Sequence, residues 1–525
     1  MRPSKPMIAL RSSSARSAWG PAGLRFPWPS CRLPATSIPQ RTLHMSPPLR
    51  GNYWDMMHVR SQQEKRRKMD KMLTDSAGQT ELPAAADAVD PSTFTRLTSA
   101  DTAKRTTPPQ CAKMLVREFI NDALYHPKYG YFSKKAYIFS PPEDIPFTRL
   151  KDNYQVMNHL ANLYKDIEGE YSDVNDIARQ VWHTPTELFR PWYGYAVAQH
   201  ILTQYKAERS DSEWDSKPLI IYEVGAGNGT LMMNILDYVQ QNEPEIYSRM
   251  QYNIIEISAK LAEGQTRRKN SRGRGGSHGT HRDHINVVNK SILEWNEMVT
   301  DDCFVVAMEV IDNFAHDMVR YDNQSGAAVQ GLVLIDQDGD YQEVYEHIND
   351  PLIQRYLEIR QRTGYKTPAL QASWRRQLRL ALPFAPNLSQ PEFIPTMLMV
   401  MFERLHEYFP NHHVVLSDFS QLPDAIPGID GPVVQTRYQG LMIPCSTYLV
   451  QPGWFDIFFP TNFELARDMY EAVCGSRTAN GRARAAQVLT QERFLQINGN
   501  LKETTTRSGE NPMLTFYKNM KFLVS

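Results

Sequence analysis

The 525-residue chain has few cysteines and no excess of either charge, and each shortage excludes a class of protein. Its five cysteines lie far apart and never form a CxxC pair, which excludes a disulfide scaffold and a thiolate zinc site and fits a reducing compartment. Lys and Arg number 58, and so do Asp and Glu, so the basic excess typical of a constitutive nucleic-acid binder is missing. The histidines lack ligand partners at usable spacing, so we expect no metal site.

Long hydrophobic runs are also missing. No stretch reaches the roughly 18 consecutive apolar residues that a membrane-spanning helix needs, and we expect no membrane span. Hydrophobic residues still make up 41% of the chain, which is enough for real cores. At roughly 100 to 200 residues per domain, this length predicts two or three domains, and it leaves the oligomeric state open.

Acidic residues are missing from the first part of the chain. Residues 1–50 contain eight Lys or Arg, eight Ser and no Asp or Glu. This composition is typical of a mitochondrial transit peptide and predicts import into the mitochondrial matrix; the alternative is an ordinary disordered basic tail. Residues 51–107 have mixed charge and an Ala/Asp-rich stretch, which predicts a disordered linker. The folded part is therefore expected to begin near Pro108.

An amphipathic helix is predicted at the start of the folded part, over Cys111–Leu124, where apolar residues recur at helical spacing. An aromatic turn from Tyr125 to Phe132 follows, punctuated by Pro and Gly. From the residues alone, this turn is better explained as a plug of the core than as a binding element.

The most informative stretch is residues 217–236, which predicts a strand, a glycine loop and a helix. Leu219–Val224 is an apolar run with one acid, Glu223, and it is bounded by Pro and Gly, as a buried parallel strand would be. Three glycines at alternate positions follow, Gly225, Gly227 and Gly229. Such a unit brings the backbone and a helix N-terminus close to a ligand and suits a nucleotide-like cofactor. The spacing differs from the G-x-G-x-x-G dinucleotide fingerprint, and an acid at the strand end favours an amino group over a pyrophosphate.

Further buried runs alternate with helical stretches and indicate a mostly parallel, doubly wound α/β domain. These runs are Tyr252–Ile257, Ile285–Asn289, Cys303–Val310, Gly331–Ile335 and His413–Ser417. Glu256, near the end of the first run, can accept hydrogen bonds from both hydroxyls of a ribose; the alternative is a solvated acid at a strand end.

A Gly- and Arg-rich insertion, residues 264–284, lies between the first two of these runs. Its composition predicts a disordered surface segment. Contact with RNA is the weaker alternative, because no aromatic residues interleave with the basic ones to stack bases.

Several short motifs follow one another along the chain and together span most of residues 111–525. The motifs are Glu118-Phe119 with Tyr125-His126-Pro127-x-Tyr129-Gly130-Tyr131-Phe132, Thr184-x-x-Glu187-x-Phe189, Glu223-Val-Gly-Ala-Gly-Asn-Gly-Thr-Leu231, Ile255-Glu256-Ile257-Ser258, Ala307-Met-Glu309-Val-Ile-Asp312, Asp418-Phe419, Pro452-Gly453-Trp-Phe-Asp456-Ile and Thr490-Gln491-x-x-Phe494-Leu495. In this order they resemble the signatures of the MidA-type methyltransferases. That family includes mitochondrial protein arginine methyltransferases that assist the assembly of respiratory complex I.

The resemblance implies a Rossmann-like, doubly wound methyltransferase sheet with an additional, mainly helical substrate or cap region. It implies S-adenosyl-L-methionine (SAM) as the cofactor. The cofactor-binding residues that it implies are Glu223, Gly225, Gly227, Gly229 and Glu256, and the substrate-binding residues are Tyr125, His126 and Glu187. The domains expected from it are an N-terminal helical or cap region (108–216), the SAM-binding core (217–345), a helical insertion (346–410) and the C-terminal completion of the sheet (411–525).

The resemblance also implies a reaction, the symmetric dimethylation of an arginine on a complex I subunit. A guanidinium, whose pKa lies above 12, is no nucleophile until a proton is removed, and paired carboxylates can hold it and take that proton. We expect Glu309 and Asp312 to fill this role. The alternative is that Asp312 caps a following helix while Glu309 holds the methionine end of SAM.

The chain departs from the family pattern on the substrate side. An insertion of roughly Ile138–Ala178 precedes the position of the family's GDF element, which is absent, and Met308, Val310 and Ile311 replace the Asn and both Phe of its NEFFDALP element. These departures leave two alternatives to an arginine methyltransferase. One is a non-catalytic assembly scaffold with a SAM fold, and the other is a methyltransferase that acts on RNA or a small molecule.

Overall fold

The computed structural model of the chain describes residues 93–134, 136–168, 180–182, 184–207, 217–269, 281–370, 386–422, 430–438 and 441–525. These residues all lie in one compact unit, Arg60–Ser525. The expected transit peptide, most of the expected linker and most of the basic insertion at 264–284 lie outside the described residues. Within the described ranges, no helix has both the length and the apolar character needed to cross a membrane.

The larger sheet has seven strands in the spatial order β17-β18-β13-β8-β5-β6-β7. Their bounds are β5 Ile220–Val224, β6 Gln251–Ile255, β7 Ile285–Val288, β8 Cys303–Met308, β13 His412–Phe419, β17 Gln487–Thr490 and β18 Met520–Val524. The five consecutive strands from β13 to the edge strand β7 are parallel, and β18 runs antiparallel to both of its neighbours. The expected doubly wound α/β sheet is therefore confirmed.

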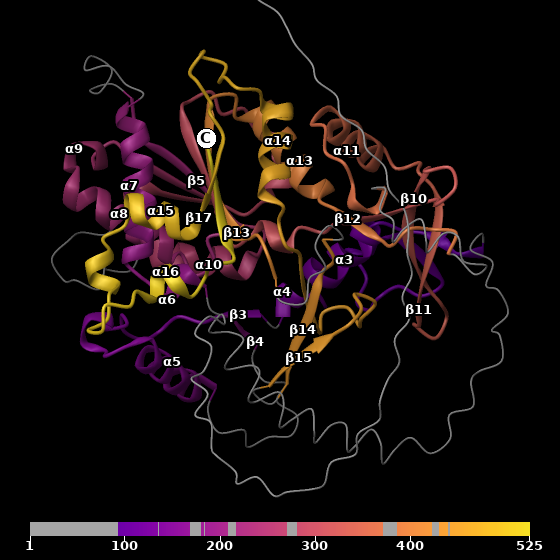
Figure 1. Cartoon of the computed structure of the whole chain (residues 1–525), viewed down its shortest axis with the longest axis horizontal. Helices are drawn as coiled ribbons and strands as arrows, with labels where there is room; N and C mark the ends of the chain where they lie inside the picture. The colour runs from indigo at the N-terminus through magenta and orange to yellow at the C-terminus, as the bar shows by residue number, and fades with distance from the viewer. Residues whose placement is uncertain are drawn as a thin grey trace, which may run out of the picture. The chain divides into compact units, whose positions relative to one another are not determined.

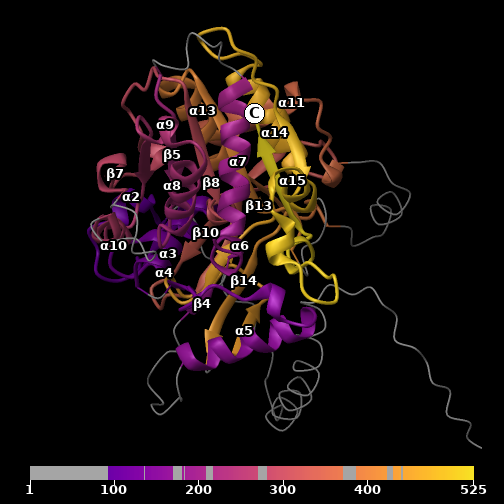
Figure 2. The same cartoon turned by 90° about the vertical axis from the view of Figure 1, so that its left-hand side faces the viewer.

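Both faces of this sheet are covered, as continuous apolar strands require. Side chains alternate along each strand, so that in β5 Ile221 joins the core on one face and Ile220 joins the core on the other. Helices α7 (Trp192–Ala207) and α8 (Thr230–Asn242) cover the first face, and α13 (Thr396–Tyr408) and α14 (Phe463–Cys474) cover the second. Figures 1 and 2 show the sheet between these two layers.

A second sheet packs beside the first and is mostly antiparallel. Its strands are β1 Thr95–Arg96, β2 Ala112–Leu115, β9 Asp317–Tyr321, β10 Ala328–Ile335, β11 Tyr341–His347 and β12 Glu392–Ile394. The run Gly331–Ile335, expected in the doubly wound sheet, forms part of β10 here and pairs antiparallel with β2 and β11. That expectation is wrong, because a buried apolar run does not reveal which sheet it joins.

The predicted helix over Cys111–Leu124 is wrong in its first part. Ala112–Leu115 pairs with β10 as β2, and the helix, α3, spans Val116–Tyr125. The predicted linker is also wrong at its end, because Thr95–Arg96 pairs with β2 and Thr98 caps the short helix α2 (Ser99–Thr102). Pairing across the sheet decides both outcomes, and the local pattern could not reveal it.

Smaller elements complete the described part of the chain. A three-stranded sheet contains β14 (Val433–Tyr438), β15 (Leu441–Cys445) and β16 (Asp456–Phe458), and β3 (Ala136–Ile138) pairs in parallel with β4 (Gln180–Trp182). The remaining helices are α4 Tyr131–Lys134, α5 Asn153–Glu168, α6 Pro185–Leu188, α9 Pro244–Tyr247, α10 Ala259–Lys269, α11 Pro351–Arg362, α15 Gln491–Asn498 and α16 Pro512–Thr515.

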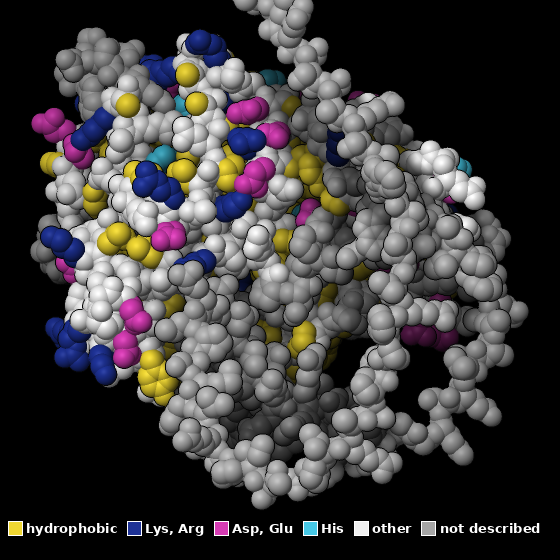
Figure 3. Space-filling model, in the orientation of Figure 1, with side chains coloured by type: hydrophobic (Ala, Val, Ile, Leu, Met, Phe, Trp, Pro, Cys, Tyr) yellow, Lys and Arg dark blue, Asp and Glu magenta, His cyan; other side chains and the backbone are white. Residues whose placement is uncertain are grey.

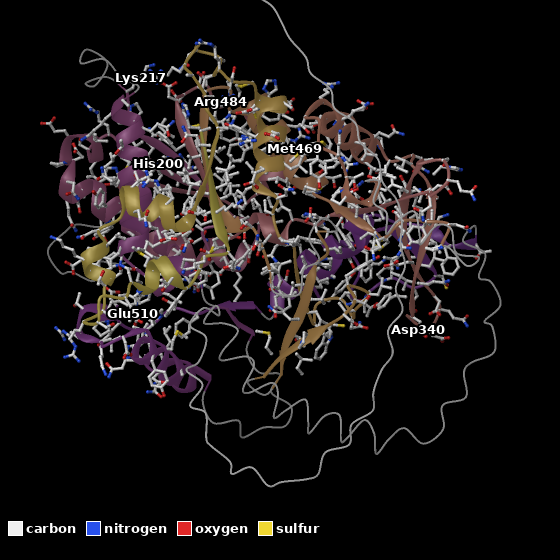
Figure 4. The ribbon with its side chains drawn as sticks, in the orientation of Figure 1. His200, Lys217, Asp340, Met469, Arg484 and Glu510 are labelled. Carbon is white, nitrogen blue, oxygen red and sulfur yellow. The ribbon has the colours of Figure 1, made fainter. Side chains whose placement is uncertain are left out.

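Buried polar side chains fix the packing between elements. Arg484, labelled in Figure 4, is 2% exposed and donates to the carbonyl oxygens of His412, Cys474 and Pro410. Arg117 at the start of α3 forms ion pairs with Asp317 of β9 and Asp350, which caps α11. On the face shown in Figure 3, Lys and Arg side chains lie among Asp and Glu side chains, in keeping with the balanced composition.

Candidate functional site

The candidate site lies where the strand order of the larger sheet reverses. From the central strand β5 the chain passes to β6 and β7 on one side, and then returns to β8 and β13 on the other. In open α/β sheets, ligands bind at the carboxyl ends of the strands beside such a reversal. The loops that follow β5, β6, β8 and β13 meet here and carry most of the expected site residues.

The glycine loop after β5 has a left-handed backbone at all three of its glycines. Gly225, Gly227 and Gly229 have φ angles of 67°, 51° and 74°, which disfavour residues with a Cβ. Space is also short, because a Cβ on Gly225 would lie 2.9 Å from Cγ2 of Val310, and one on Gly227 would lie 2.7 Å from Cδ1 of Ile138. The loop therefore needs glycine for both its conformation and its close contacts.

Glu187, expected to contact the substrate, holds the glycine loop instead. It is 2% exposed, and its Oε1 accepts hydrogen bonds from Nδ2 of Asn228 at 3.0 Å and from Oγ1 of Thr230 at 2.8 Å. Its Oε2 is buried and accepts no hydrogen bond, and it lies 3.7 Å from Nη1 of Arg190. Glu187 thus ties α6 to the residues that begin α8.

Glu223 and Glu256 lie at the ends of β5 and β6, as expected. The carboxyl of Glu223 accepts a hydrogen bond from the Tyr252 hydroxyl at 2.9 Å, and burial raises its pKa to about 8. Glu256 accepts from the Ser258 amide at 2.9 Å and from Nε2 of Gln265 at 3.0 Å. The same Gln265 nitrogen lies 2.9 Å from the carbonyl oxygen of Gly227, so Gln265 connects Glu256 to the glycine loop.

Glu309 begins the loop after β8 in an unusual conformation. Its φ is 57°, a left-handed value that is costly for a residue with a side chain and is found mostly at functional sites. Its amide donates to the Ser417 carbonyl at 2.9 Å, and its carboxyl accepts from Oγ1 of Thr186 at 3.5 Å. Burial and the nearby Asp418 raise its pKa well above the usual value.

Asp312 follows in the same loop and has a different environment. Its amide donates to Oδ2 of Asp418 at 3.0 Å, but its own Oδ1 is buried without a hydrogen-bond donor. Burial and the carboxyls of Asp418, Asp456 and Glu309 raise the pKa of Asp312 well above the usual value. Asp312 lies inside the 3₁₀ turn Ile311–Asn313 rather than at its N-cap, so the alternative that it caps a helix is wrong.

Two residues from other parts of the chain, Asp456 and Tyr125, bond Asn313 beside Asp312. Asp456, at the start of β16, accepts from Nδ2 of Asn313 at 3.2 Å, and burial raises its pKa to about 7. Tyr125, at the end of α3, donates its hydroxyl to the Asn313 carbonyl at 3.1 Å. The structure therefore brings Tyr125 to the loop that carries Asp312.

His126, in contrast, does not lie with these residues. Its Nε2 bonds the Thr102 carbonyl at 2.9 Å, and its Nδ1 accepts from the amides of Lys128 and Tyr129 at 3.1 and 3.4 Å. Its ring also stacks on that of Tyr129, with centroids 3.5 Å apart. With both ring nitrogens bonded to the backbone, His126 stabilises the turn after α3.

We define the acidic cluster as Glu309, Asp312, Asp418 and Asp456, four buried carboxyls from the loop after β8, the end of β13 and the start of β16. Within the part of the chain that the structure describes, none of the four forms an ion pair with a Lys or Arg side chain. Nor do the described residues contain a group of His, Cys, Asp and Glu side chains arranged to hold a metal ion. Buried carboxyls without a counter-ion can bind a cation or share protons.

Sequence reasoning assigned no role to Asp418 or Asp456, although both stand in the motifs that carry the resemblance. For Asp418 a signal was present, because it is an acid at the carboxyl end of a buried strand, as Glu256 is. For Asp456 there was none. Its neighbour Asn313 lies 143 residues earlier, and only the fold brings the two together.

Comparisons with known proteins agree with this geometry. The family model described as "Putative S-adenosyl-L-methionine-dependent methyltransferase" matches residues 196–481, more than half of the chain. A Schizosaccharomyces pombe protein named "Protein arginine methyltransferase NDUFAF7 homolog, mitochondrial" is 24% identical over 395 residues, which cover 70% of this chain and 77% of that protein.

Solved structures from Burkholderia thailandensis show a weaker likeness. A protein described as a likely methyl transferase, bound to S-adenosyl-homocysteine, has a TM-score of 0.48. It is 14% identical to this chain, and the match covers 81% of this chain and 89% of that chain. A native structure of a superfamily protein from that organism has a TM-score of 0.46, with the same identity and coverage. The family match, in contrast, spans the glycine loop and the loops of the acidic cluster. The chain therefore belongs to the MidA-type family of SAM-dependent methyltransferases, and its cofactor is SAM.

Proposed function

We propose that the chain is a mitochondrial protein arginine methyltransferase that symmetrically dimethylates an arginine of a complex I subunit and so acts in complex I assembly. The observation that carries the proposal is the buried Oδ1 of Asp312. Among the described residues it has no hydrogen-bond donor, and the carboxyls around it form no ion pair with Lys or Arg. A guanidinium supplies both the N–H donors and the positive charge that this cluster lacks. The name of the Schizosaccharomyces pombe relative supports arginine as the acceptor, and the motif resemblance supports complex I.

The glycine loop and the acids beside it would hold the cofactor. Gly225, Gly227 and Gly229 let the backbone come close to it, and Glu256 retains lone pairs for the ribose hydroxyls after bonding Ser258 and Gln265. Glu223 fixes the end of β5 through its bond to Tyr252. The residues present thus fit SAM, which when bound supplies a methyl group on a sulfonium.

Glu309 belongs on the cofactor side of the site in this proposal. Its carboxyl contacts Thr186 and interacts with Glu187, and Glu187 holds the glycine loop. An acid in this position suits the amino group at the methionine end of SAM, which is the alternative role raised by the sequence. Its raised pKa would fall when a positive group binds, because an opposite charge favours the ionised form.

Asp312 and Asp456 would hold the guanidinium of the substrate. Asp312 interacts electrostatically with Asp456, and Tyr125 interacts with both. Two carboxylates on a planar guanidinium fix its orientation, and Asp312 can accept the proton that the nitrogen loses as it attacks. Burial raises the pKa of Tyr125, so its hydroxyl stays protonated and keeps donating to Asn313. Asp418 holds the Asp312 backbone in place.

The test is the fate of a labelled methyl group. The full chain is incubated with methyl-labelled SAM and a mitochondrial extract from cells that lack the protein, and the label is followed into protein, RNA and small molecules. We expect symmetric dimethylarginine in one complex I subunit, and a loss of about 100-fold or more with Asp312→Asn. The matched control is Asp338→Asn, which changes an exposed acid in the turn between β10 and β11 and should leave the rate unchanged.

Other outcomes would support the alternatives. Label in RNA or in the soluble pool would support a different substrate class. Binding of SAM without any transfer, together with rescue of complex I assembly by Gly227→Ala, would support a non-catalytic scaffold.

Location can be tested separately. The word mitochondrial in the relative's name supports a mitochondrial location, and the acid-free composition of residues 1–50 supports import into the matrix. A reporter carrying residues 1–50 should enter isolated, energised mitochondria and resist added protease. A version with its arginines changed to glutamine should not.

A further inference from the structure

A segment of the insertion that the family pattern lacks lies over the glycine loop. We call residues 138–144 the strap. Its first residue, Ile138, ends β3, and the Ile138 carbonyl accepts a hydrogen bond from Nδ2 of Asn228 at 3.3 Å. Cδ1 of Ile138 lies 2.7 Å from the position that a Cβ on Gly227 would take. The strap therefore contacts two residues of the loop.

One side chain, Arg190, holds the rest of the strap. Arg190 is 7% exposed, and its Nη1 donates to Oγ of Ser140 at 2.8 Å. Its Nε donates to Oδ1 of Asp144 at 3.0 Å, and its Nη2 donates to the carbonyl oxygen of Pro141. A guanidinium can reach all three acceptors because its five N–H groups form a rigid fork, which a lysine ammonium does not.

The same guanidinium faces the residue that holds the glycine loop. Nη1 of Arg190 lies 3.7 Å from Oε2 of Glu187, and Oε1 of Glu187 accepts from Asn228 and Thr230. Asn228 in turn lies between Glu187 and the Ile138 carbonyl, within reach of both. A continuous network of polar contacts therefore links the strap to the glycine loop through Arg190, Glu187 and Asn228.

Apolar side chains anchor both ends of the strap. Phe139 and Ile145 are buried in the core on the face of α7 and α8. Phe147, just beyond, stacks on Phe189, with ring centroids 5.4 Å apart. Between these anchors, Arg190 bonds Ser140, Pro141 and Asp144.

We propose that Arg190 is a positioning residue for the cofactor, because it pins the strap over the glycine loop and so lengthens the residence of SAM. The proposal rests on the role proposed for the glycine loop in cofactor binding. Loss of the guanidinium would release Ser140–Asp144 and leave the buried Glu187 without its cation. Both changes would loosen the loop, and differences in affinity among variants of one site appear mostly in the dissociation rate.

The experiment measures the dissociation of S-adenosyl-homocysteine from the full chain by stopped-flow. For Arg190→Ala we expect the dissociation rate constant to rise about tenfold or more, with the association rate constant changed less than about threefold. For Arg190→Lys, which keeps the charge but not the planar guanidinium, the dissociation rate constant should rise less, by about threefold. Arg149→Ala removes an exposed arginine near the strap and should behave as the wild type.

Hydrogen exchange supplies a second measurement. In Arg190→Ala the amides of residues 138–145 and 225–230 should exchange faster, while those of β8 should not. A folded Arg190→Ala protein with wild-type dissociation and exchange would overturn the proposal. If Arg190→Ala does not fold, the double variant Ser140→Ala/Asp144→Ala replaces it, and an unchanged dissociation rate in that protein overturns the proposal equally.

Failure of this proposal can be told apart from failure of the cofactor loop assignment. Normal binding by Gly227→Ala would remove the loop from the cofactor site. Weak binding by Gly227→Ala together with unchanged dissociation from Arg190→Ala would leave the loop in place and remove only the role of Arg190.

Discussion

The amide of Asp312 donates a hydrogen bond to Oδ2 of Asp418 at 3.0 Å, and this bond joins the loop after β8 to the end of β13. The other oxygen of Asp418 accepts from the Phe419 amide at 2.8 Å. Both carboxyl oxygens of Asp418 thus accept hydrogen bonds from backbone amides, whereas no described residue donates to Oδ1 of Asp312. Two acids of the same chemistry therefore have different tasks, since one fixes the loop and the other remains available to a ligand.

The first prediction concerns stability without a ligand. Asp312→Asn should leave the ligand-free protein as stable as the wild type or more stable, because it removes a buried carboxyl that has no hydrogen-bond donor at one oxygen. Asp418→Ala should lower the free energy of unfolding by about 2 kcal/mol, because buried amides lose their acceptor. Urea unfolding near neutral pH measures both changes. A strongly destabilised Asp312→Asn protein would show that Asp312 serves the fold rather than a ligand.

The second prediction concerns the glycine loop. Gly227→Ala should weaken SAM binding by about 100-fold, because φ is 51° and the new methyl group would press on Ile138. Gly264→Ala is the matched control, since a Cβ there meets nothing within 4 Å and Gly264 lies in α10. Calorimetry should show wild-type affinity for that variant. Equal affinity in Gly227→Ala would remove the loop from the cofactor site.

The third prediction separates two neighbouring residues that the sequence placed in one group. Tyr125→Phe removes the donor to the Asn313 carbonyl and should lower the rate of methyl transfer about tenfold, because Asn313 also bonds Asp456. SAM affinity should not change. A rate equal to that of the wild type would place Tyr125 outside the site.

His126→Ala is the comparison variant for Tyr125→Phe. It should lower the free energy of unfolding by about 2 kcal/mol, because three backbone groups, two of them buried, lose a partner. The rate of methyl transfer per folded molecule should remain that of the wild type. The two variants together distinguish a residue of the site from a residue of the turn.

The main sheet could be predicted because its information is local. Runs such as Cys303–Met308 are buried at every position, and the bounds of β5, β6, β7 and β8 lie within two residues of the expected ones. The position of the glycine loop directly after β5 also follows from the local sequence, because glycine tolerates the positive φ angles found there. In each case the residues of a short stretch of chain favour the local structure that the stretch adopts.

The rest depended on partners far along the chain. Ala112–Leu115 carries a helix-like pattern but becomes a strand because β10 offers an edge to pair with. The family resemblance placed Glu187 among the substrate-binding residues, yet the hydrogen bonds that it accepts from Asn228 and Thr230 hold it against the glycine loop. Asp456 joins the acidic cluster only because β16 brings it beside Asn313. Local sequence patterns contain none of these pairings.

The last prediction is the dependence of stability on pH. Burial raises the pKa of Asp418 and of Asp456 to about 7 and that of Glu223 to about 8, whereas unfolded carboxyls titrate near 4. Between these values the folded protein binds more protons than the unfolded chain, so the free energy of unfolding falls as pH rises. Burial lowers the pKa of His200, His316 and His412, which acts in the opposite direction but only below about pH 6.5.

Urea unfolding of the ligand-free chain should therefore show stability falling from about pH 6.5 to about pH 8. Asp456→Asn should reduce this fall by about 1 kcal/mol, because one of the buried carboxyls no longer titrates. Asp338→Asn, on the surface, should keep the wild-type slope. A stability that rises over this interval, or an Asp456→Asn slope equal to that of the wild type, would mean that the acidic cluster is already ionised in the folded protein. A cation held within the cluster would then have to be sought, because four buried carboxylates cannot all remain charged without one.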